Sequence, residues 1–312
     1  MGEINDQIKK LNFQPLKLLS TGKFGEVWKA KDICTEQIVV IKPIRKQINQ
    51  SIYKTLNTIE HPSLSTKSRV EQIEDQHFII REFLEGKTLK ELIFKPWSRK
   101  KHTRRFWLKA FSHLLGGLEK LHQNNILHLD IKPSNLIVNS LNGEPAPESI
   151  KLVDFEQAAI YPIEDKWLRR PFALGYSPPE QLLNINQLAS PATDIFALGV
   201  TLYETLTQKN GFYYHDPEMM MHLQLNVPLL RTTKLPATLY TILSKATARV
   251  AFHLPPSRLS QNQAEEIIQQ GIQKRYTSAE AFKNAIDEYL DKNNDHRTNW
   301  FEKLFNKLKQ KH

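Results

Sequence analysis

The first third of the chain alternates short apolar runs with turn residues, a pattern that predicts β-strands. Residues 13–42 fit three strands, and residues 77–86 fit another strand followed by a connection. Only a short helix fits between Lys42 and His61, because few residues separate them. The beginning of the chain is therefore expected to be rich in β-structure.

Helical spacing dominates the remainder of the chain. Pro191 to Leu206 is apolar on most sides, which predicts a buried helix with Ser190 as its N-cap. The segment Thr277–Glu280 predicts a capping box that opens a last helix. A further helix is predicted by apolar residues that recur at intervals of three and four, namely Phe106, Trp107, Ala110, Phe111, Leu114, Leu115, Leu118 and Leu121.

Composition is typical of a soluble globular protein: 312 residues, of which 40% are hydrophobic and 24% charged. A single cysteine, Cys34, excludes an internal disulfide and fits a reducing compartment, so a cytoplasmic protein is expected. No apolar run reaches the roughly 18 residues of a membrane span, and the start is too polar for a secretory signal. The net charge of +10 favours acidic partners, whether nucleotide, lipid or polypeptide.

An acid, an amine and an amide occur together in the short loop His128–Asn135, between a predicted helix and an apolar run. This loop resembles the catalytic loop of the protein kinases, H-x-D-x-K-x-x-N. The resemblance implies that Asp130 accepts or orients the proton of an attacking hydroxyl, and that Lys132 neutralises charge on the transferred phosphoryl group. It also implies that Asn135 holds a magnesium ion by its carbonyl oxygen. Taken alone, the loop also fits an ordinary polar turn.

Two upstream segments are similar to the nucleotide-binding elements of the same family. Ser20–Val27 resembles the Gly-rich loop G-x-G-x-x-G-x-V with Ser20 at the first glycine, and a plain hairpin turn is the alternative. Glycine lets backbone N–H groups approach phosphate oxygens closely. Gln37–Lys42 resembles the strand motif V-A-I-K, which implies that Lys42 contacts the α- and β-phosphates. The implied nucleotide site comprises Ser20, Gly22, Phe24 over the phosphates, Gly25, Lys42, the backbone of Glu82 and Leu84, and Val27, Val40 and Ile137 around the adenine.

The segment Ile150–Glu156 resembles the metal motif D-F-G, with Glu156 in place of glycine. The resemblance implies that Asp154 bridges magnesium and phosphate. Because glycine gives this segment backbone freedom in the family, its replacement predicts a less mobile metal motif.

The family pairs the strand lysine with a glutamate on the next helix, and this sequence departs from that pattern. Ile52 or the nearby Gln50 occupies the aligned position, and Glu60 is the only acid between Lys42 and His61. The ion pair of Lys42 is therefore absent, rebuilt by Glu60, or formed from elsewhere in the chain.

Leu129 stands next to Asp130, where most regulated kinases carry an arginine that holds a phosphorylated activation loop. Residues 156–174 contain no serine or threonine, and Tyr161 is their only hydroxyl. Both features predict that loop phosphorylation, on Tyr161 or on the nearby Ser177, does not activate the protein.

Two later segments, Leu174–Glu180 and Ser190–Gly199, resemble the structural scaffold of the family. By this resemblance Asp194 holds the backbone of the catalytic loop, and Arg275 is a candidate partner of Glu180. Both roles are structural rather than chemical.

The implied fold class is α+β: a two-lobed, protein-kinase-like fold with ATP and Mg²⁺ between a small β-rich lobe and a larger helical lobe. Residues 1–84 form the first lobe, and residues 85–293 form the second, with a surface insertion at 248–273. Residues 294–312 read as a basic amphipathic helix that either docks on its own domain or binds an anionic membrane or a partner.

The resemblance implies transfer of the γ-phosphoryl group of ATP to a serine or threonine of a protein substrate, since Asp130–Asn135 has the form found in Ser/Thr kinases. Two other functions stay open. One is a pseudokinase that binds nucleotide and signals by contact, and the other is a small-molecule kinase of related fold. No specific nucleic-acid partner is predicted, and the expected location is the cytoplasm, peripheral at a membrane if the C-terminal segment binds lipid.

Overall fold

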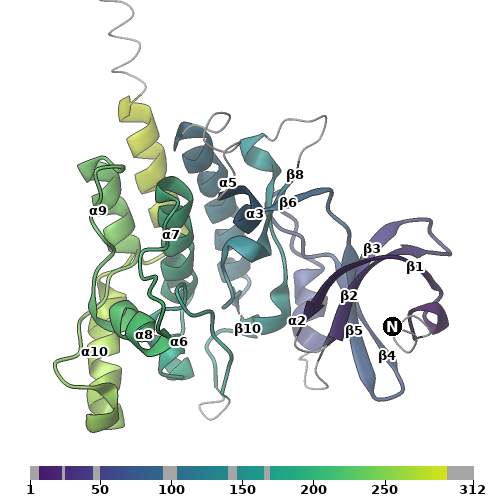
Figure 1. Cartoon of the computed structure of the whole chain (residues 1–312), viewed down its shortest axis with the longest axis horizontal. Coiled ribbons are helices and arrows are strands. Elements are labelled where there is room, and N and C mark those ends of the chain that lie inside the picture. Colours follow the sequence, from purple (N-terminus) through teal and green to yellow (C-terminus); the bar gives the residue numbers. More distant parts are fainter. Residues whose placement is uncertain are drawn as a thin grey trace, which may run out of the picture.

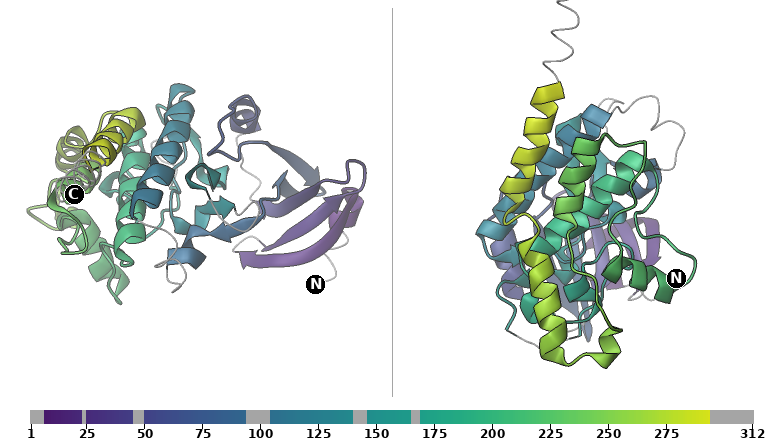
Figure 2. Two further views of the ribbon diagram at one scale, coloured as in Figure 1. Left: turned by 90° about the horizontal axis from the view of Figure 1, so that it is seen from above. Right: turned by 90° about the vertical axis from the view of Figure 1, so that its left-hand side faces the viewer.

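A computed structural model describes residues 7–22, 25–44, 50–93, 104–139, 146–164 and 169–293. Strands gather in the N-terminal part of the chain and helices in the rest (Figure 1). Seen from above, the sheet lies at one end of the molecule and the C-terminal helices lie at the other (Figure 2). The predicted α+β fold class is confirmed.

One antiparallel five-stranded sheet, in the order β1-β2-β3-β5-β4, forms the N-terminal part. One face of this sheet buries Phe13, Ile41 and Phe78 together with Ile8, which precedes the first strand. The opposite face packs toward a short helix, α2, and the helical part of the molecule. The strands are β1 (Phe13–Gly22), β2 (Gly25–Asp32), β3 (Ile38–Ile44), β4 (Ser68–Ile73) and β5 (Gln76–Glu82), and α2 spans Gln50–Leu56.

Helices α5 and α7 cross the centre of the larger part, surrounded by shorter helices (Figure 1). None of the helices among the described residues is both long enough and apolar enough to cross a membrane. The helices are α3 (Leu89–Ile93), α5 (Arg104–Gln123), α6 (Pro179–Leu182), α7 (Pro191–Thr207), α8 (Pro217–Asn226), α9 (Ala237–Ala246), α10 (Gln261–Gln273) and a last helix over residues 279–293.

Two small sheets lie between these layers and carry the loops of the site. Strand β8 (Leu136–Asn139) pairs with β6 (Gly86–Thr88) and β9 (Ile150–Leu152), and β7 (Ile126–Leu127) pairs with β10 (Ala159–Ile160). Backbone hydrogen bonds from Ser65 N to Leu152 O (3.0 Å) and from Leu152 N to Ser63 O (2.8 Å) join the two parts of the molecule.

The two central helices form as their patterns predict. Of the eight apolar residues whose spacing predicted α5, seven are buried, and the eighth, Phe106, is partly buried against the same core. Helix α7 begins at Pro191, and the backbone N–H of Ser190 donates to Thr193 Oγ1 at 3.0 Å. Because α7 is apolar on nearly every side, it is enclosed by the other helices and provides a fixed support for the catalytic loop.

The cap of the last helix lies one residue later than predicted. Ser278 Oγ, rather than the Thr277 side chain, accepts the backbone N–H of Ala281 at 3.0 Å. The backbone N–H of Glu280, which the Thr277 side chain would accept in the predicted box, donates instead to Glu119 Oε2 at 3.0 Å. The contact with Glu119 instead ties the start of this helix to α5.

The predicted insertion contains helix α10, which buries Ala264 and Ile268 against Ile185. Gln187 also donates to Glu265 at 2.7 Å. The segment therefore packs on the region around α6. The lobe boundary at residue 84 stays a prediction, and residues 294–312 lie outside the described residues.

Candidate active site

One buried carboxylate holds the loop that follows β7. Asp194, at the start of α7, accepts the backbone N–H of His128 and that of Leu129, each at 2.8 Å. The two N–H groups converge on it where Leu129 adopts a left-handed conformation, with φ of 64°. Burial raises the pKa of Asp194, but the hydrogen bond and charge of His122, with the His128 N–H, outweigh burial and lower that pKa. The prediction that Asp194 holds this loop is confirmed.

Three polar side chains of the loop meet at Asp130. Lys132 Nζ lies 2.8 Å from each carboxylate oxygen, and Asn135 Nδ2 donates to the Asp130 backbone oxygen at 2.8 Å and to Oδ2 at 2.9 Å. A 3₁₀ turn over Pro133–Asn135 folds the chain back to make this possible. Since the amide nitrogen of Asn135 is engaged, its carbonyl oxygen is the atom left to coordinate a cation.

A second cluster forms around the strand lysine. Lys42 Nζ lies 3.0 and 2.9 Å from the two oxygens of Asp154 and 2.6 Å from Glu156 Oε2. Burial lowers the pKa of Lys42, but the two carboxylates raise it above its usual value overall. Burial raises the pKa of Asp154, but the charge and hydrogen bond of Lys42, together with the charges of Arg81 and His128, outweigh burial and lower that pKa. Asp154 has φ of 68°, in the left-handed region that non-glycine residues seldom adopt.

Val153 joins the two clusters. Its backbone N–H donates to Asn135 O at 3.0 Å, and its carbonyl accepts from His128 Nε2 at 3.1 Å. The His128 ring also packs edge-on against Phe155, with centroids 4.9 Å apart. The catalytic loop and the metal motif are therefore fixed to each other, as the predicted roles of Asp130 and Asp154 require.

The acid expected as a candidate partner of Lys42 lies elsewhere. Glu60 pairs with Lys67 at 3.0 Å on the surface, and its side chain is 80% exposed. Ile52, in the aligned position on α2, is buried in the apolar core. Of the three alternatives left open by the sequence, the pair is formed from elsewhere, by Asp154 and Glu156. The sequence drew attention to Glu156 only as a missing glycine.

The segment that resembles a Gly-rich loop is part of the β1–β2 hairpin. Ser20 faces Val27 across the hairpin, and Gly22 faces Gly25 at its closed end. Gly25 has φ of 132°, a conformation open to glycine but strained for other residues. Phe24 lies outside the described residues, so its predicted position over the phosphates stays a prediction.

Val40 and Lys42 share one face of β3, because they are two residues apart. Arg81 is the cross-strand partner of Val40 on β5 and lies on the same face. Burial lowers the pKa of Arg81, whereas the charges of Asp154 and Glu82 oppose that shift. A second cation thus acts on Asp154. Among the other predicted adenine contacts, Leu84 is buried and Ile137 is half-buried.

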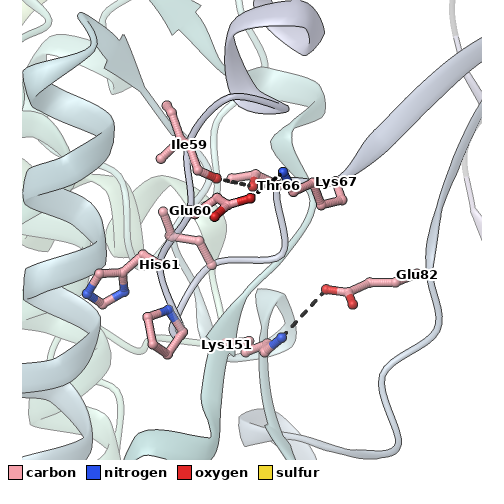
Figure 3. Close-up of a pocket in the computed structure, with 9 residues that line it drawn as sticks. Ile59, Glu60, His61, Thr66, Lys67, Glu82 and Lys151 are labelled. Carbon is pink, nitrogen blue, oxygen red and sulfur yellow. Dashed lines mark hydrogen bonds and ion pairs between the residues drawn. The ribbon is translucent and has the colours of Figure 1, made fainter.

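The side chain of Glu82 lies in a different pocket, of about 380 Å³, drawn in Figure 3. It accepts from Ser65 Oγ at 2.9 Å and faces Lys151 Nζ at 3.6 Å. Neither Lys42 nor Asp130 lines this pocket, whose remaining walls come from residues between 59 and 67. The predicted nucleotide contact of Glu82 uses its backbone, and it stays a prediction.

The candidate metal ligands fit magnesium rather than a metal whose ligands all come from the protein. Asp154 and Asn135 offer a carboxylate and an amide carbonyl, which are hard oxygen ligands. Among the described residues there is no group of three or more His, Cys, Asp or Glu side chains able to hold a metal ion. Magnesium usually takes one or two protein ligands and completes its shell with phosphate and water.

Comparison with known proteins agrees with this geometry. The family described as protein kinase domain matches residues 13–307. The chain is 29% identical over 262 residues to the serine/threonine-protein kinase PrkC of Bacillus subtilis (strain 168), covering 77% of this chain and 38% of the relative. It is 31% identical over 247 residues to the probable serine/threonine-protein kinase mkcD of Dictyostelium discoideum, covering 74% and 36%. It is also 25% identical over 255 residues to the probable serine/threonine-protein kinase PknB of Lactococcus lactis subsp. lactis (strain IL1403), covering 76% and 39%. The matched part thus spans less than two fifths of each of these relatives.

Proposed function

The chain belongs to the protein kinase family, and from this premise we propose that it transfers the γ-phosphoryl group of ATP to a serine or threonine of a protein substrate. ATP enters with magnesium between the β3 face and the catalytic loop. The observation that carries this proposal is the backbone connection through Val153, which fixes the Asp130 cluster to the Asp154 cluster.

Asp130 is the group that receives the substrate hydroxyl. Its carboxylate is 15% exposed and is held by Lys132 and Asn135, so it can accept a hydrogen bond from an incoming hydroxyl without rearranging. Lys132, already 2.8 Å from Asp130, keeps a positive charge beside the group in transfer.

Lys42 and Asp154 serve the nucleotide. The ammonium of Lys42 can donate to phosphate oxygens, and the carboxylate of Asp154 with the carbonyl of Asn135 can hold the cation. Magnesium, when bound, neutralises charge on the phosphates. Positioning and charge neutralisation are the main contributions of the protein in reactions of this type.

Incubation with labelled ATP, Mg²⁺ and a generic protein acceptor tests the proposal. We expect transfer to serine or threonine by the wild type, and a loss of about 10²- to 10⁴-fold for Asp130→Asn, the range typical of a removed general base. Equal labelling by both proteins, or labelling of tyrosine alone, would refute it.

We propose further that activation does not depend on phosphorylation of the loop after the metal motif. Leu129 is 4% exposed and packs with Ala159 and Ile163, with Tyr161 beside them. The backbone N–H of Tyr161 also donates to Asn125 O at 2.8 Å. Apolar contacts and a short strand pair thus hold this segment where a phosphate-bound arginine would otherwise act.

A nucleotide-binding pseudokinase is the second candidate, favoured by one observation. Lys42 is engaged by two carboxylates, of which Glu156 replaces the usual glycine. A pseudokinase would bind ATP but transfer no label with either the wild type or Asp130→Asn. A small-molecule kinase, the third candidate, would label an added small hydroxyl compound and leave the protein acceptor unlabelled.

A further inference from the structure

The shortest polar contact of Lys42 is with a residue that has no role in the function proposed above. Glu156 Oε2 lies 2.6 Å from the ammonium, against 2.9 and 3.0 Å for the oxygens of Asp154. The Glu156 side chain is also the better protected of the two, 13% exposed against 26%. A 3₁₀ turn over Phe155–Gln157 brings Glu156 back toward the amine that Asp154 already faces.

Tyr53 on α2 is buried where the charges of the same two carboxylates act on its hydroxyl. It is 5% exposed, and its hydroxyl has no hydrogen-bond partner among the residues that the structure describes. Burial raises the pKa of this phenol, and the nearby charges of Asp154 and Glu156 raise it further. Buried hydroxyls usually find a partner, so an unused donor near two carboxylates indicates that the partner arrives in another state of the site.

The three N–H groups of Lys42 indicate what that state is. Here they are shared between both oxygens of Asp154 and one of Glu156. When Asp154 turns its oxygens to a cation, the N–H groups that it held become available to phosphate. Glu156 can keep its own contact, because it is not one of the residues assigned to the cation.

We propose that Glu156 is the positioning residue that orients Lys42 toward the phosphates, with the Tyr53 hydroxyl donating to Glu156 in the nucleotide-bound state. The inference rests on the proposed function and deepens it, since it names how the nucleotide lysine is held. The anchoring carboxylate then lies on the metal motif itself, two residues after Asp154. Helix α2 contributes a neutral hydroxyl, and its movement cannot make or break the lysine pair.

Four variants test this: Glu156→Gln, Glu156→Asp, Tyr53→Phe, and Glu60→Gln as a surface control. Binding is measured by titration of a fluorescent ATP analogue with and without Mg²⁺, and kcat and KM for ATP are measured separately. Loss of a hydrogen bond to a charged group predicts binding weakened about 10- to 100-fold for Glu156→Gln, and a smaller loss for Tyr53→Phe. Glu156→Asp is expected to recover part of the binding, and Glu60→Gln to bind as the wild type does.

The weaker nucleotide binding of Glu156→Gln should depend on the presence of Lys42. In a Lys42→Ala background, Glu156→Gln should cause no further weakening, a result that a merely structural role would not give. Should Glu156→Gln fail to fold, Tyr53→Phe can replace it, because that substitution changes no charge. Its effect on nucleotide binding is then compared between the wild-type and the Lys42→Ala backgrounds. Wild-type affinity in Glu156→Gln, or tighter binding, would overturn the inference. Nucleotide binding can be measured even if no phosphoryl transfer occurs. Failure of the proposed kinase activity is therefore distinguishable from failure of the inference about Glu156.

Discussion

Replacing Asp194 by asparagine tests how the catalytic loop is supported. The substitution keeps the size of the side chain and removes its charge. In the wild type one oxygen accepts from Leu129 N–H and the other from His128 N–H and the His122 ring. In the variant one of these oxygens becomes an NH₂ group, so a donor faces a donor in a site that is 1% exposed.

The expected cost follows from those contacts. Losing one charge-assisted hydrogen bond and leaving one buried N–H unpaired should lower the free energy of unfolding by about 3–5 kcal/mol. The loop should also shift, and a displacement of about 1 Å at Asp130 can reduce kcat by about 10²-fold. Both effects should appear together, because one carboxylate sets both the stability and the position of the loop.

Urea unfolding followed by circular dichroism measures the first effect, and labelled-ATP transfer measures the second. Asp291→Asn, an exposed position on the last helix, is the matched control and should change neither. Wild-type stability and kcat in Asp194→Asn would refute the reasoning.

The difference in unfolding free energy between the wild type and Asp194→Asn is also expected to depend on pH, in a direction that the pKa of Asp194 fixes. The pKa of Asp194 is lowered in the folded protein, so its carboxylate contributes stability above the unfolded-state pKa of about 3.9. That contribution is lost as pH falls through the folded-state value. The stability gap between the wild type and Asp194→Asn should therefore be widest near neutral pH and shrink in acid.

Three further predictions concern other parts of the chain. Arg275→Met should destabilise the protein by about 3–5 kcal/mol in urea unfolding, because it leaves Glu180, fully buried and 2.6 Å from Arg275, without its counter-charge; stability equal to the wild type would contradict this. Tyr161→Phe should retain wild-type kcat, and an activating phosphate on Tyr161 found by mass spectrometry would exclude our view of the loop. A chain truncated after Lys292 tests the alternatives left open for residues 294–312: weaker co-sedimentation with anionic vesicles than the full chain would favour membrane binding, and unchanged binding would exclude it.

Much of the fold could be predicted from the sequence, because it depends on short-range patterns. The stripe from Phe106 to Leu121 repeats at helical spacing, so its buried face was predictable before any partner was known. Ser190 and Pro191 likewise mark the start of α7 by local chemistry. The pairing of Glu180 with Arg275 came from a family resemblance, and the structure confirms it with two hydrogen bonds of 2.6 and 3.1 Å.

The sequence by itself thus determined the order of the elements and the identity of the loop around Asp130. Only the tertiary structure decided which acid holds Lys42, since Glu156 lies more than one hundred residues along the chain and carries no local sign of that pairing. It likewise decided that Glu60 faces solvent and that the Tyr53 hydroxyl is buried within reach of the charges of Asp154 and Glu156. Periodicity and capping act over a few residues, whereas the pairing of a charge is fixed by which segments pack together and exclude water around it.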